Sequence, residues 1–437
     1  MSEKKLTLIS LGCEKNLVDS EMILGLISHA KYEIINDVSQ SDLIIVNTCG
    51  FIESAKKEAI DTIFDCINQK KKDAKLVVTG CLVQRYLDDL KKDIPEVDLW
   101  VPIRDYFKLG TLLDNLFNDN TFNNLKMDFQ NRIISTPNYL AYVRIGDGCN
   151  NRCAYCAIPL IRGNLKSREK EDIIKEVKDL VDKGYLEICL ISQDLSNYGY
   201  DINTTLTSLL KDLVKIEKLK WLRLLYLYPD EISDEFIEVV RDNPKILPYF
   251  DIPLQHASDK ILKQMHRRGN KEYVIKLIKK IRDMIPNAII RTTMIVGFPH
   301  ETENDVLELI DFMKQVRFNH LGAFMYSKEE DTLAYNMSHQ VSKKDKIKRY
   351  NMVMDEQKWI SYSLNKEMIG KHYECILEKY NQDDDTFVGR TYAFAPDDID
   401  GEVIIYNDHK YNESEVGTIK NIVITDATFY DLIGEFK

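Results

Sequence analysis

The chain has 437 residues, and its 59 basic against 70 acidic side chains give a net charge of −11. This length predicts two or three domains rather than one core. An acidic chain is a poor ligand for nucleic acid, because phosphate binding depends on clustered Lys and Arg. No apolar run approaches the roughly 18 residues of a membrane helix, and the first residues show no cleavable signal. We therefore expect a cytoplasmic protein, with no membrane partner and no direct nucleic-acid binding.

The first part of the chain alternates buried strands with helices, which indicates a parallel α/β sheet. The strands are predicted at 6–13, 42–49 and 76–81, and the helices at 18–29 and 53–71. Each of the three strands ends in a cysteine, namely Cys13, Cys49 and Cys81. Ligands of such sheets bind beyond the carboxyl ends of the strands. The sequence therefore predicts that these three thiols converge on one edge of the sheet.

Three thiols at the same topological position favour metal ligation, although a single free cysteine is more often a small buried hydrophobic residue. The chain has nine cysteines and no secretion signal, so the thiols are expected to be reduced or metal-bound rather than paired in disulfides. Cys66, Cys189 and Cys375 lie at no strand end and are interpreted as packing residues.

Residues 118–138 are rich in Asn, Asp, Thr and Pro and show weak periodicity. They predict a linker or an irregular crossing between domains. We place the first domain at 1–125 and the linker at 126–138.

Cys149, Cys153 and Cys156 form a CxxxCxxC run directly after this boundary. Thiolates are soft ligands that suit iron–sulfur clusters and zinc. A four-iron cluster normally takes four cysteines, so three leave one iron open to a substrate or a second cofactor. The alternative is structural zinc, which usually pairs CxxC with a second pair or with histidines. His256 and His266 are distant from the run and are not paired at ligand spacing.

Six strands alternate with helices after Tyr139, which predicts a partial (β/α) barrel. The strands are predicted at 140–145, 186–192, 221–228, 249–254, 288–298 and 320–327, and the helices at 169–183, 205–215, 233–243, 271–285 and 303–316. Barrel chemistry sits at the carboxyl ends of the strands. Polar residues near those ends should line the same mouth as the cysteine run: Gln193, Asp194, Tyr228, Gln255, His256, Arg291 and Tyr326.

A further helix, predicted at 343–366, leads into a tail of short strands. The strands are predicted at 373–379, 386–393, 402–406 and 419–430, which fits a small β-barrel. Residues 365–437 hold sixteen acidic and seven basic side chains, a net charge of −9. Such a charge can be a solvated surface, but on a small barrel it predicts an anionic face that attracts a basic protein and repels RNA.

The CxxxCxxC run, with Tyr155 before its last cysteine, resembles the cluster loop of the radical S-adenosylmethionine (SAM) enzymes. The turn Gly297-Phe-Pro-His-Glu resembles their Gly-Phe-Pro-Gly-Glu-Thr turn, with His300 in place of glycine. His300 should fit there only with a negative φ. The resemblance implies that the open iron binds SAM. Tyr155, Gln193, Gln255, Arg291 and Gly297 are then candidate cofactor-binding residues, and His256 is a weaker candidate.

The chain resembles the methylthiotransferase family over its whole length. The matching stretches are Ser-Leu-Gly-Cys13-Glu-Lys-Asn-Leu-Val-Asp-Ser-Glu21, Gln193-Asp-Leu-Ser-Asn-Tyr-Gly199, Arg223-Leu-Leu-Tyr-Leu-Tyr-Pro229, Asp251-Ile-Pro-Leu-Gln-His256 and Phe324-Met-Tyr-Ser-Lys-Glu-Glu330. The resemblance implies an N-terminal α/β domain, a radical SAM barrel at 139–365 and a TRAM β-barrel at 366–437. It also implies two [4Fe-4S] clusters, one on Cys149, Cys153 and Cys156 and an auxiliary one on Cys13, Cys49 and Cys81.

Within that family, the matching stretches favour the branch that adds a methylthio group to the β-carbon of an aspartate in small-subunit ribosomal protein twelve, using two SAM molecules. The alternative is the branch that modifies a tRNA adenosine with the same clusters, for which a basic tail is expected. The implied partners are a basic ribosomal protein and electron and sulfur donors of unknown identity. A non-catalytic iron–sulfur carrier is a weaker alternative, because it needs neither a barrel nor an open iron. No catalytic side chain beyond the ligands is assigned.

Overall fold

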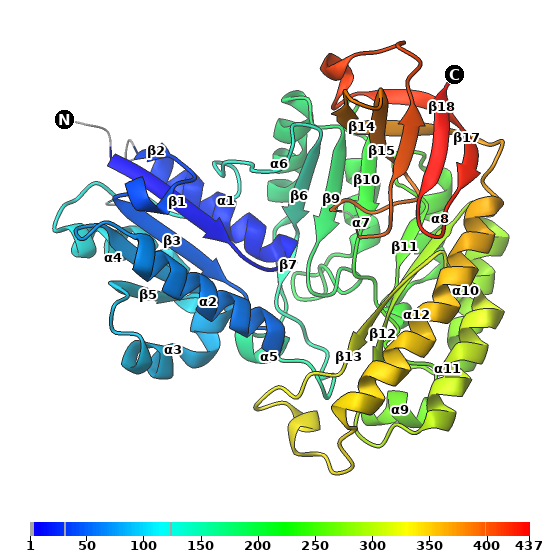
Figure 1. Ribbon diagram of the computed structural model, residues 1–437, viewed down its shortest axis with the longest axis horizontal. Coiled ribbons are helices and arrows are strands. Elements are labelled where there is room, and N and C mark those ends of the chain that lie inside the picture. The colour runs from blue at the N-terminus through cyan, green and yellow to red at the C-terminus, as the bar shows by residue number, and fades with distance from the viewer. Residues whose placement is uncertain (1–3, 30–31, 123–124, 398) are drawn as a thin grey trace.

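The computed structural model describes residues 4–29, 32–122, 125–397 and 399–437. Three bodies follow one another along the chain (Figure 1). An α/β domain is joined to a central half-open barrel, and a small β-barrel at the C-terminus packs on that central barrel. Residues 123–124, which belong to the segment predicted as a linker or crossing, lie outside the described residues.

The N-terminal domain is a five-stranded parallel sheet in the order β2-β1-β3-β4-β5. Its strands are β1 (Lys4–Ser10), β2 (Tyr32–Ile34), β3 (Leu43–Thr48), β4 (Lys75–Gly80) and β5 (Leu99–Pro102), and its helices are α1 (Glu14–Ser28), α2 (Glu53–Gln69), α3 (Cys81–Asp93) and α4 (Leu109–Phe117). Every residue of β3 is buried, because helices cover both faces of the sheet (Figure 1). The parallel α/β sheet is thus confirmed, while the short edge strands β2 and β5 were not predicted.

The central domain holds six parallel strands in two sheets, ordered β10-β9-β6 and β11-β12-β13. The strands are β6 (Leu140–Arg144), β9 (Glu187–Ile191), β10 (Trp221–Leu224), β11 (Tyr249–Asp251), β12 (Ile289–Val296) and β13 (His320–Met325). A bridge between Leu222 and Ile246 links the two sheets. The helices α6 (Lys170–Asp182), α7 (Leu206–Leu213), α8 (Asp234–Asp242), α10 (Lys271–Met284) and α11 (Glu303–Val316) cover the outside (Figure 1). The fold is the predicted half-open (β/α) barrel.

Shorter elements complete the central domain. They are the two-stranded ribbon β7 (Gly146–Asp147) and β8 (Lys166–Ser167) and the short helices α5 (Ile158–Ile161) and α9 (Asp259–Gln264). The ribbon and α5 flank the CxxxCxxC run on either side. The long helix α12 (Lys343–Lys366) then leads to the C-terminal domain.

The C-terminal domain is a closed barrel in the order β14-β15-β16-β18-β17. Its strands are β14 (His372–Asn381), β15 (Thr386–Thr391), β16 (Val403–Tyr406), β17 (Ile419–Ala427) and β18 (Leu432–Phe436). The predicted strand 419–430 is wrong at its end, because β17 stops at Ala427 and the chain turns back into β18. Pairing of β18 with β16 and β17 closes the barrel and leaves no open edge.

The segment between the first two domains is an irregular crossing packed against both of them. The side chain of Arg132 is 2% exposed, and it pairs with Glu21 on α1 and with Glu176 on α6. Gly25 on α1 lies so close to the segment that a Cβ there would stand 2.3 Å from the carbonyl oxygen of Asn131. The crossing therefore helps to fix the first domain against the barrel.

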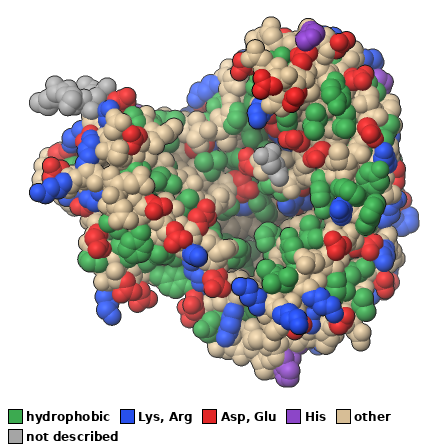
Figure 2. Space-filling view, viewed as in Figure 1, with side chains coloured by type: hydrophobic (Ala, Val, Ile, Leu, Met, Phe, Trp, Pro, Cys, Tyr) green, Lys and Arg blue, Asp and Glu red, His purple; other side chains and the backbone are tan. Residues whose placement is uncertain are grey.

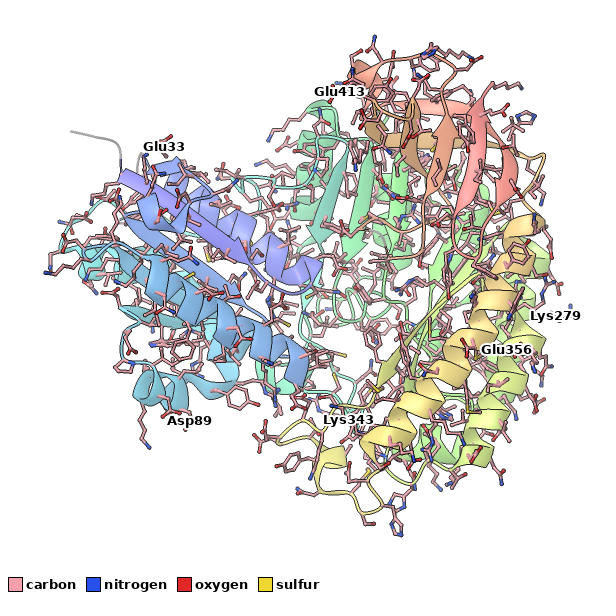
Figure 3. All side chains as sticks on the ribbon, in the orientation of Figure 1. Glu33, Asp89, Lys279, Lys343, Glu356 and Glu413 are labelled. Carbon is pink, nitrogen blue, oxygen red and sulfur yellow. The ribbon has the colours of Figure 1, made fainter. Side chains whose placement is uncertain are left out.

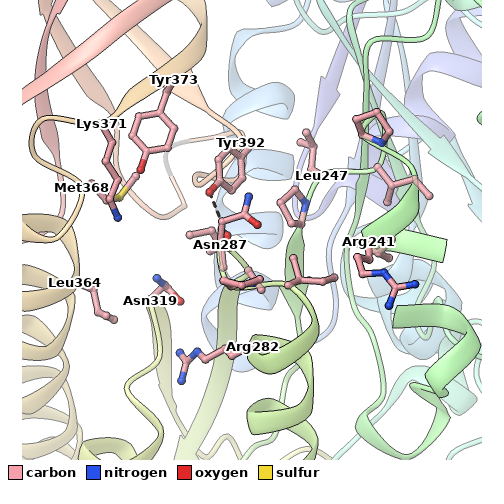
Figure 4. A pocket seen from close by; sticks show the side chains of 18 of the residues that line it. Arg241, Leu247, Arg282, Asn287, Asn319, Leu364, Met368, Lys371, Tyr373 and Tyr392 are labelled. Carbon is pink, nitrogen blue, oxygen red and sulfur yellow. Dashed lines mark hydrogen bonds between the residues drawn. The ribbon is translucent and has the colours of Figure 1, made fainter. Parts of the chain in front are cut away.

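The C-terminal barrel covers the N-terminal ends of the central strands. Glu187, the first residue of β9, pairs with Arg390 at 2.6 Å, and Arg291 on β12 pairs with Asp400 at 3.1 Å. Beside this contact lies a cavity of about 780 Å³ (Figure 4). Residues of both domains line it, among them Arg241, Arg282, Asn287, Asn319, Lys371, Tyr373 and Tyr392. The cavity lies at the end of the barrel opposite to the carboxyl ends of the strands.

Candidate functional site

The three cysteines of the first domain meet at the carboxyl ends of adjacent strands. Cys13 precedes α1, Cys49 follows β3, and Cys81 opens α3 directly after β4. A Cβ on Gly12, which has a φ of +92°, would lie 3.0 Å from the Sγ of Cys49, so the two loops touch. Burial, which Arg162 opposes and the neighbouring Cys13 and Cys49 reinforce, raises the pKa of the Cys81 thiol to about 12. The structure thus brings together the three thiols that the sequence placed at one edge.

The second triad occupies the loop between β7 and α5. The Cys149 amide donates to the carbonyl oxygen of Gly163 at 3.1 Å, and the Cys156 amide donates to that of Cys153 at 3.1 Å. Burial raises the pKa of Cys156 to about 12, with Cys153 and then Cys149 among the further causes. The loop therefore folds so that its three thiols lie near one another.

Both triads offer sulfur alone, the donor that iron–sulfur clusters take. No group of three or more His, Cys, Asp or Glu among the described residues is arranged around a single metal ion. The other three cysteines are buried as packing residues, as predicted. His256 belongs to neither triad: its Nδ1 accepts from the amide of Ser258 at 3.0 Å, and its Nε2 lies 3.4 Å from Glu301.

The first triad adjoins the loop of the second triad at the boundary between the first domain and the barrel. Cys81 packs in one buried cluster with Ala157 and Ile161, and Ala157 is the residue after Cys156. Figure 2 shows a hollow between these two bodies.

Helix α1 docks the first domain on the barrel through the stretch that begins at Cys13. Glu14 accepts from the hydroxyl of Tyr226 at 2.9 Å, and the ammonium of Lys15 lies 3.2 Å from the centre of the same ring. Asp19 pairs with Arg144 at 2.6 Å and with Arg162 at 2.8 Å. These polar side chains are therefore part of the interface that holds the triads in register.

A second contact joins the first domain to the barrel. Glu329, after β13, is 2% exposed and pairs with Lys56 on α2 and with Arg85 on α3, each at 2.9 Å. Arg85 also donates to the carbonyl oxygen of Gly50, next to Cys49, at 2.9 Å. The stretch 324–330 thus binds the first domain, a role that the sequence did not reveal.

Gln193 and Asp194, after β9, both contact the cysteine loop. The Gln193 amide nitrogen donates to Asp147 at 2.9 Å, and Asn151 donates to Asp194 at 2.6 Å. The Oε1 atom of Gln193 is buried without a hydrogen-bond partner among the described residues. An acceptor left open beside the second triad fits a ligand that carries a donor, such as the ammonium group of SAM.

Arg267 connects the cysteine loop, which includes Tyr155, to the segment around Gln255. The Arg267 guanidinium lies 3.7 Å from the Sγ of Cys153 and donates to the carbonyl oxygen of Pro253 at 2.6 Å. Gln255, with a φ of +76°, donates to the same carbonyl at 3.3 Å. Burial raises the pKa of Tyr155 well above its usual value, although Arg267 opposes this. Tyr155 therefore stays neutral.

Gly297 has a φ of +75°, and its amide donates to both carboxylate oxygens of Glu301 at 2.9 Å. A Cβ there would stand 2.3 Å from Lys346, so the position requires glycine. The expected negative φ of His300 is wrong: it is +65°, and the ring packs on that of His339 with centroids 4.5 Å apart.

Arg291 is placed differently from the other candidate SAM contacts. It pairs with Asp251 at 2.9 Å and with Asp400 of the C-terminal barrel at 3.1 Å. The expectation that Arg291 lines the same mouth as the cysteine run is wrong, because it lies near the start of β12 and its charge is compensated by two carboxylates at the covered end of the barrel. Sequence reasoning missed three side chains that the site does contain, Asp147, Arg162 and Arg267. The sequence signal that could have identified them was their proximity to Cys149, Cys156 and His266, respectively.

Comparison with known sequences agrees with this arrangement. Residues 5–102 match the Uncharacterized protein family UPF0004, residues 143–313 the Radical SAM superfamily and residues 369–436 the TRAM domain. No described helix is long and apolar enough to cross a membrane.

Two solved structures share the fold. TsrM from Kitasatospora setae, a radical S-adenosylmethionine methyltransferase with cobalamin and a [4Fe-4S] cluster bound, has a TM-score of 0.56 at 14% identity and covers 76% of this chain and 77% of its own. The cobalamin-dependent S-adenosylmethionine radical enzyme OxsB has a TM-score of 0.51 at 13% identity and covers 82% of this chain and 56% of its own.

Full-length relatives are much more similar. The ribosomal protein uS12 methylthiotransferase RimO of Clostridioides difficile (strain 630) is 44% identical over 99% of this chain and 98% of its own length. RimO of Thermoanaerobacter sp. (strain X514) is 43% identical over 99% of this chain and 100% of its own length. With this identity over nearly every residue, and with both triads on one domain boundary, the chain belongs to the RimO family of ribosomal protein uS12 methylthiotransferases.

Proposed function

We propose that the protein transfers a methylthio group to the β-carbon of an aspartate in ribosomal protein uS12. The observation that supports the proposal is that Cys81 of the first triad packs against Ala157, the residue that follows Cys156 of the second triad, at the boundary of the two domains. A reaction that must bring sulfur to an unactivated carbon needs both a radical source and a sulfur source at the same place. The full-length RimO relatives support the same activity.

Cys149, Cys153 and Cys156 would hold a [4Fe-4S] cluster, and Cys13, Cys49 and Cys81 a second one. With SAM bound, such a pair supplies the radical and the sulfur chemistry, which an aspartate β C–H bond requires because it is too weakly acidic for a side-chain base. The protein orients and shields these groups. Gln193 offers its open Oε1 to the SAM ammonium, and the Glu329 contact with Lys56 and Arg85 holds the first domain against the barrel.

The charge of the C-terminal barrel supports a basic protein as the substrate. Exposed acidic residues on this barrel include Asp383, Asp384, Asp408, Glu413 and Glu435. Figure 2 shows acidic side chains on the visible face of this barrel, and Figure 3 places Glu413 at its outer edge. Because the barrel covers the strand ends opposite to the triads, this surface would hold the body of a substrate protein rather than the modified aspartate. A tRNA phosphate backbone would be repelled there.

The modification is placed in the cytoplasm, where a small-subunit ribosomal protein is available. An electron donor and a sulfur donor are also needed.

The deciding experiment compares two substrates. Anaerobically reconstituted protein with SAM and a reductant is incubated separately with uS12 and with tRNA, and both are then analysed by mass spectrometry. We expect a methylthio mass gain on an aspartate of uS12 and none on tRNA. The Cys81→Ala variant should still cleave SAM to deoxyadenosine while the uS12 product disappears. A gain on tRNA alone would contradict the proposal.

A further inference from the structure

Arg162 lies between the two triads and touches residues of both domains. It follows α5, six residues after Cys156, and its side chain is 2% exposed. On the side of the first domain, its Nη2 lies 2.7 Å from Asn16, 2.8 Å from Asp19 and 3.7 Å from the Sγ of Cys81. One edge of a single guanidinium therefore binds a proposed ligand of the auxiliary cluster.

The other edge faces the SAM side. Nη1 lies 3.2 Å from Oδ2 of Asp147. The other oxygen of this carboxylate accepts from the Gly148 amide at 3.1 Å and from the Gln193 side chain at 2.9 Å. Gly148 begins the cysteine loop, and Gln193 carries the open acceptor. Asp147 thus connects Arg162 to Gly148 of the cysteine loop and to Gln193.

The backbone around Arg162 adds a second connection. Gly163, the next residue, accepts from the amide of Cys149, and Asn164 accepts from the side chain of Arg152 within the loop at 2.6 Å. A Cβ on Gly148 would stand 2.2 Å from the carbonyl oxygen of Asn164, so the two segments are in close contact. A shift of Arg162 would therefore move the loop as well as Asp147.

We propose that Arg162 is a positioning residue that couples the Cys13–Cys49–Cys81 site to SAM binding. When the cluster is bound at this site, the position of the Cys81 sulfur is fixed. This sulfur and Asp19 then fix the guanidinium of Arg162, and Asp147 in turn holds Gln193 toward SAM. SAM and the auxiliary cluster should accordingly strengthen each other's binding, since coupling between two sites is reciprocal. The inference rests on the proposed function, because it needs Cys81 to be a cluster ligand.

Arg132, another buried arginine at this boundary, lacks such contacts. Arg132 binds Glu21, Glu176 and the carbonyl oxygen of Tyr142, none of them part of a triad or of the Gln193 contact. Arg132→Met removes a buried charge at the same boundary and is the matched control. Arg162→Lys keeps the charge, but an ammonium lacks the planar fork that reaches Cys81 and Asp147 together.

The test measures the dissociation constant of SAM by equilibrium dialysis on reconstituted protein with oxidised clusters, where SAM is bound and not consumed. Cys81→Ala is combined with each arginine variant. In the otherwise unchanged protein, we expect Cys81→Ala to weaken SAM binding at least about fivefold. In the Arg162→Met and Arg162→Lys backgrounds, Cys81→Ala should not change the dissociation constant of SAM further. In the Arg132→Met background the fivefold effect should remain.

Equal effects of Cys81→Ala in all backgrounds, or no effect in the unchanged protein, would overturn the coupling. If Arg162→Met fails to fold, Arg162→Lys decides alone. Two further measurements test the proposed function separately from this coupling. Unchanged iron content in Cys81→Ala would show that Cys81 holds no cluster. Coupling without a product on uS12 would support this inference but contradict the substrate assignment.

Discussion

Asp19 on α1 and Arg144 on β6 form an ion pair of 2.6 Å across the boundary of the first domain and the barrel. Both side chains are buried, and Asp19 also pairs with Arg162. A buried carboxylate between two guanidiniums fixes the orientation of α1, and with it the position of Cys13 at the start of that helix. The relative placement of the two triads thus depends on charges that neither triad contains.

Asp19→Asn should destabilise the protein by about 3–5 kcal/mol, because it leaves two buried guanidiniums without their shared carboxylate. Urea unfolding followed by circular dichroism measures the change. The control is Glu235→Gln, which breaks the exposed 2.7 Å pair with Lys211 and should cost no more than about 1 kcal/mol. Equal midpoints for the two variants would show that the Asp19 pairs do not hold the domains.

Cys13→Ala, Cys49→Ala and Cys81→Ala should each lower the iron content of reconstituted protein from about eight to about four atoms, since one of two four-iron clusters is lost. Iron analysis together with sulfide analysis measures this. Cys66→Ala is the matched control, because Cys66 is buried in α2 away from the strand ends. A loss of iron in the Cys66 variant, or none in the other three, would contradict the ligand assignment.

Glu187 should make the contact of the C-terminal barrel acid-sensitive. Burial disfavours its charged form, but Arg390 and Arg223 outweigh this and lower its pKa from 4.5 to about 2. The folded-state pKa lies below the unfolded one, so its contribution of about 3 kcal/mol is present above pH 4.5 and is lost as the pH falls toward 2. Unfolding in urea between pH 3 and pH 6 should show this slope.

Glu187→Gln is the variant that isolates this carboxylate. It should unfold more easily at pH 6, because two arginines lose their buried partner. Its stability should also depend less on pH between 4.5 and 3 than that of the unchanged protein. The same slope in both proteins would assign the acid sensitivity to other groups.

His300 should tolerate asparagine better than valine. Its φ of +65° lies in the left-handed region, which Asn adopts readily and which a β-branched side chain resists. We expect His300→Val to be about 1 kcal/mol less stable than His300→Asn, measured by thermal unfolding. Both variants lose the ring contact with His339, so their difference isolates the backbone. Equal melting temperatures would exclude a backbone cost at this turn.

The sequence by itself determined the features that depend on nearby residues. Cys149, Cys153 and Cys156 lie within one short loop, so their spacing alone identifies a three-thiolate site. Cys13, Cys49 and Cys81 are distant in the chain, yet parallel strands place their carboxyl ends together, and this rule was enough to group them. Strand and helix periodicity likewise determined the half-open barrel and most of the C-terminal barrel.

Only the tertiary structure decided which side chains connect these parts. Arg162 reaches Cys81 and Asp19, and Glu329 reaches Arg85, over separations in sequence at which no pattern indicates contact. The positive φ of His300 and the return of the chain into β18 were also decided there. Periodicity reports which face of an element is buried, whereas a charged side chain enters the interior only where packing supplies its partner, and that partner is set by the arrangement of whole domains.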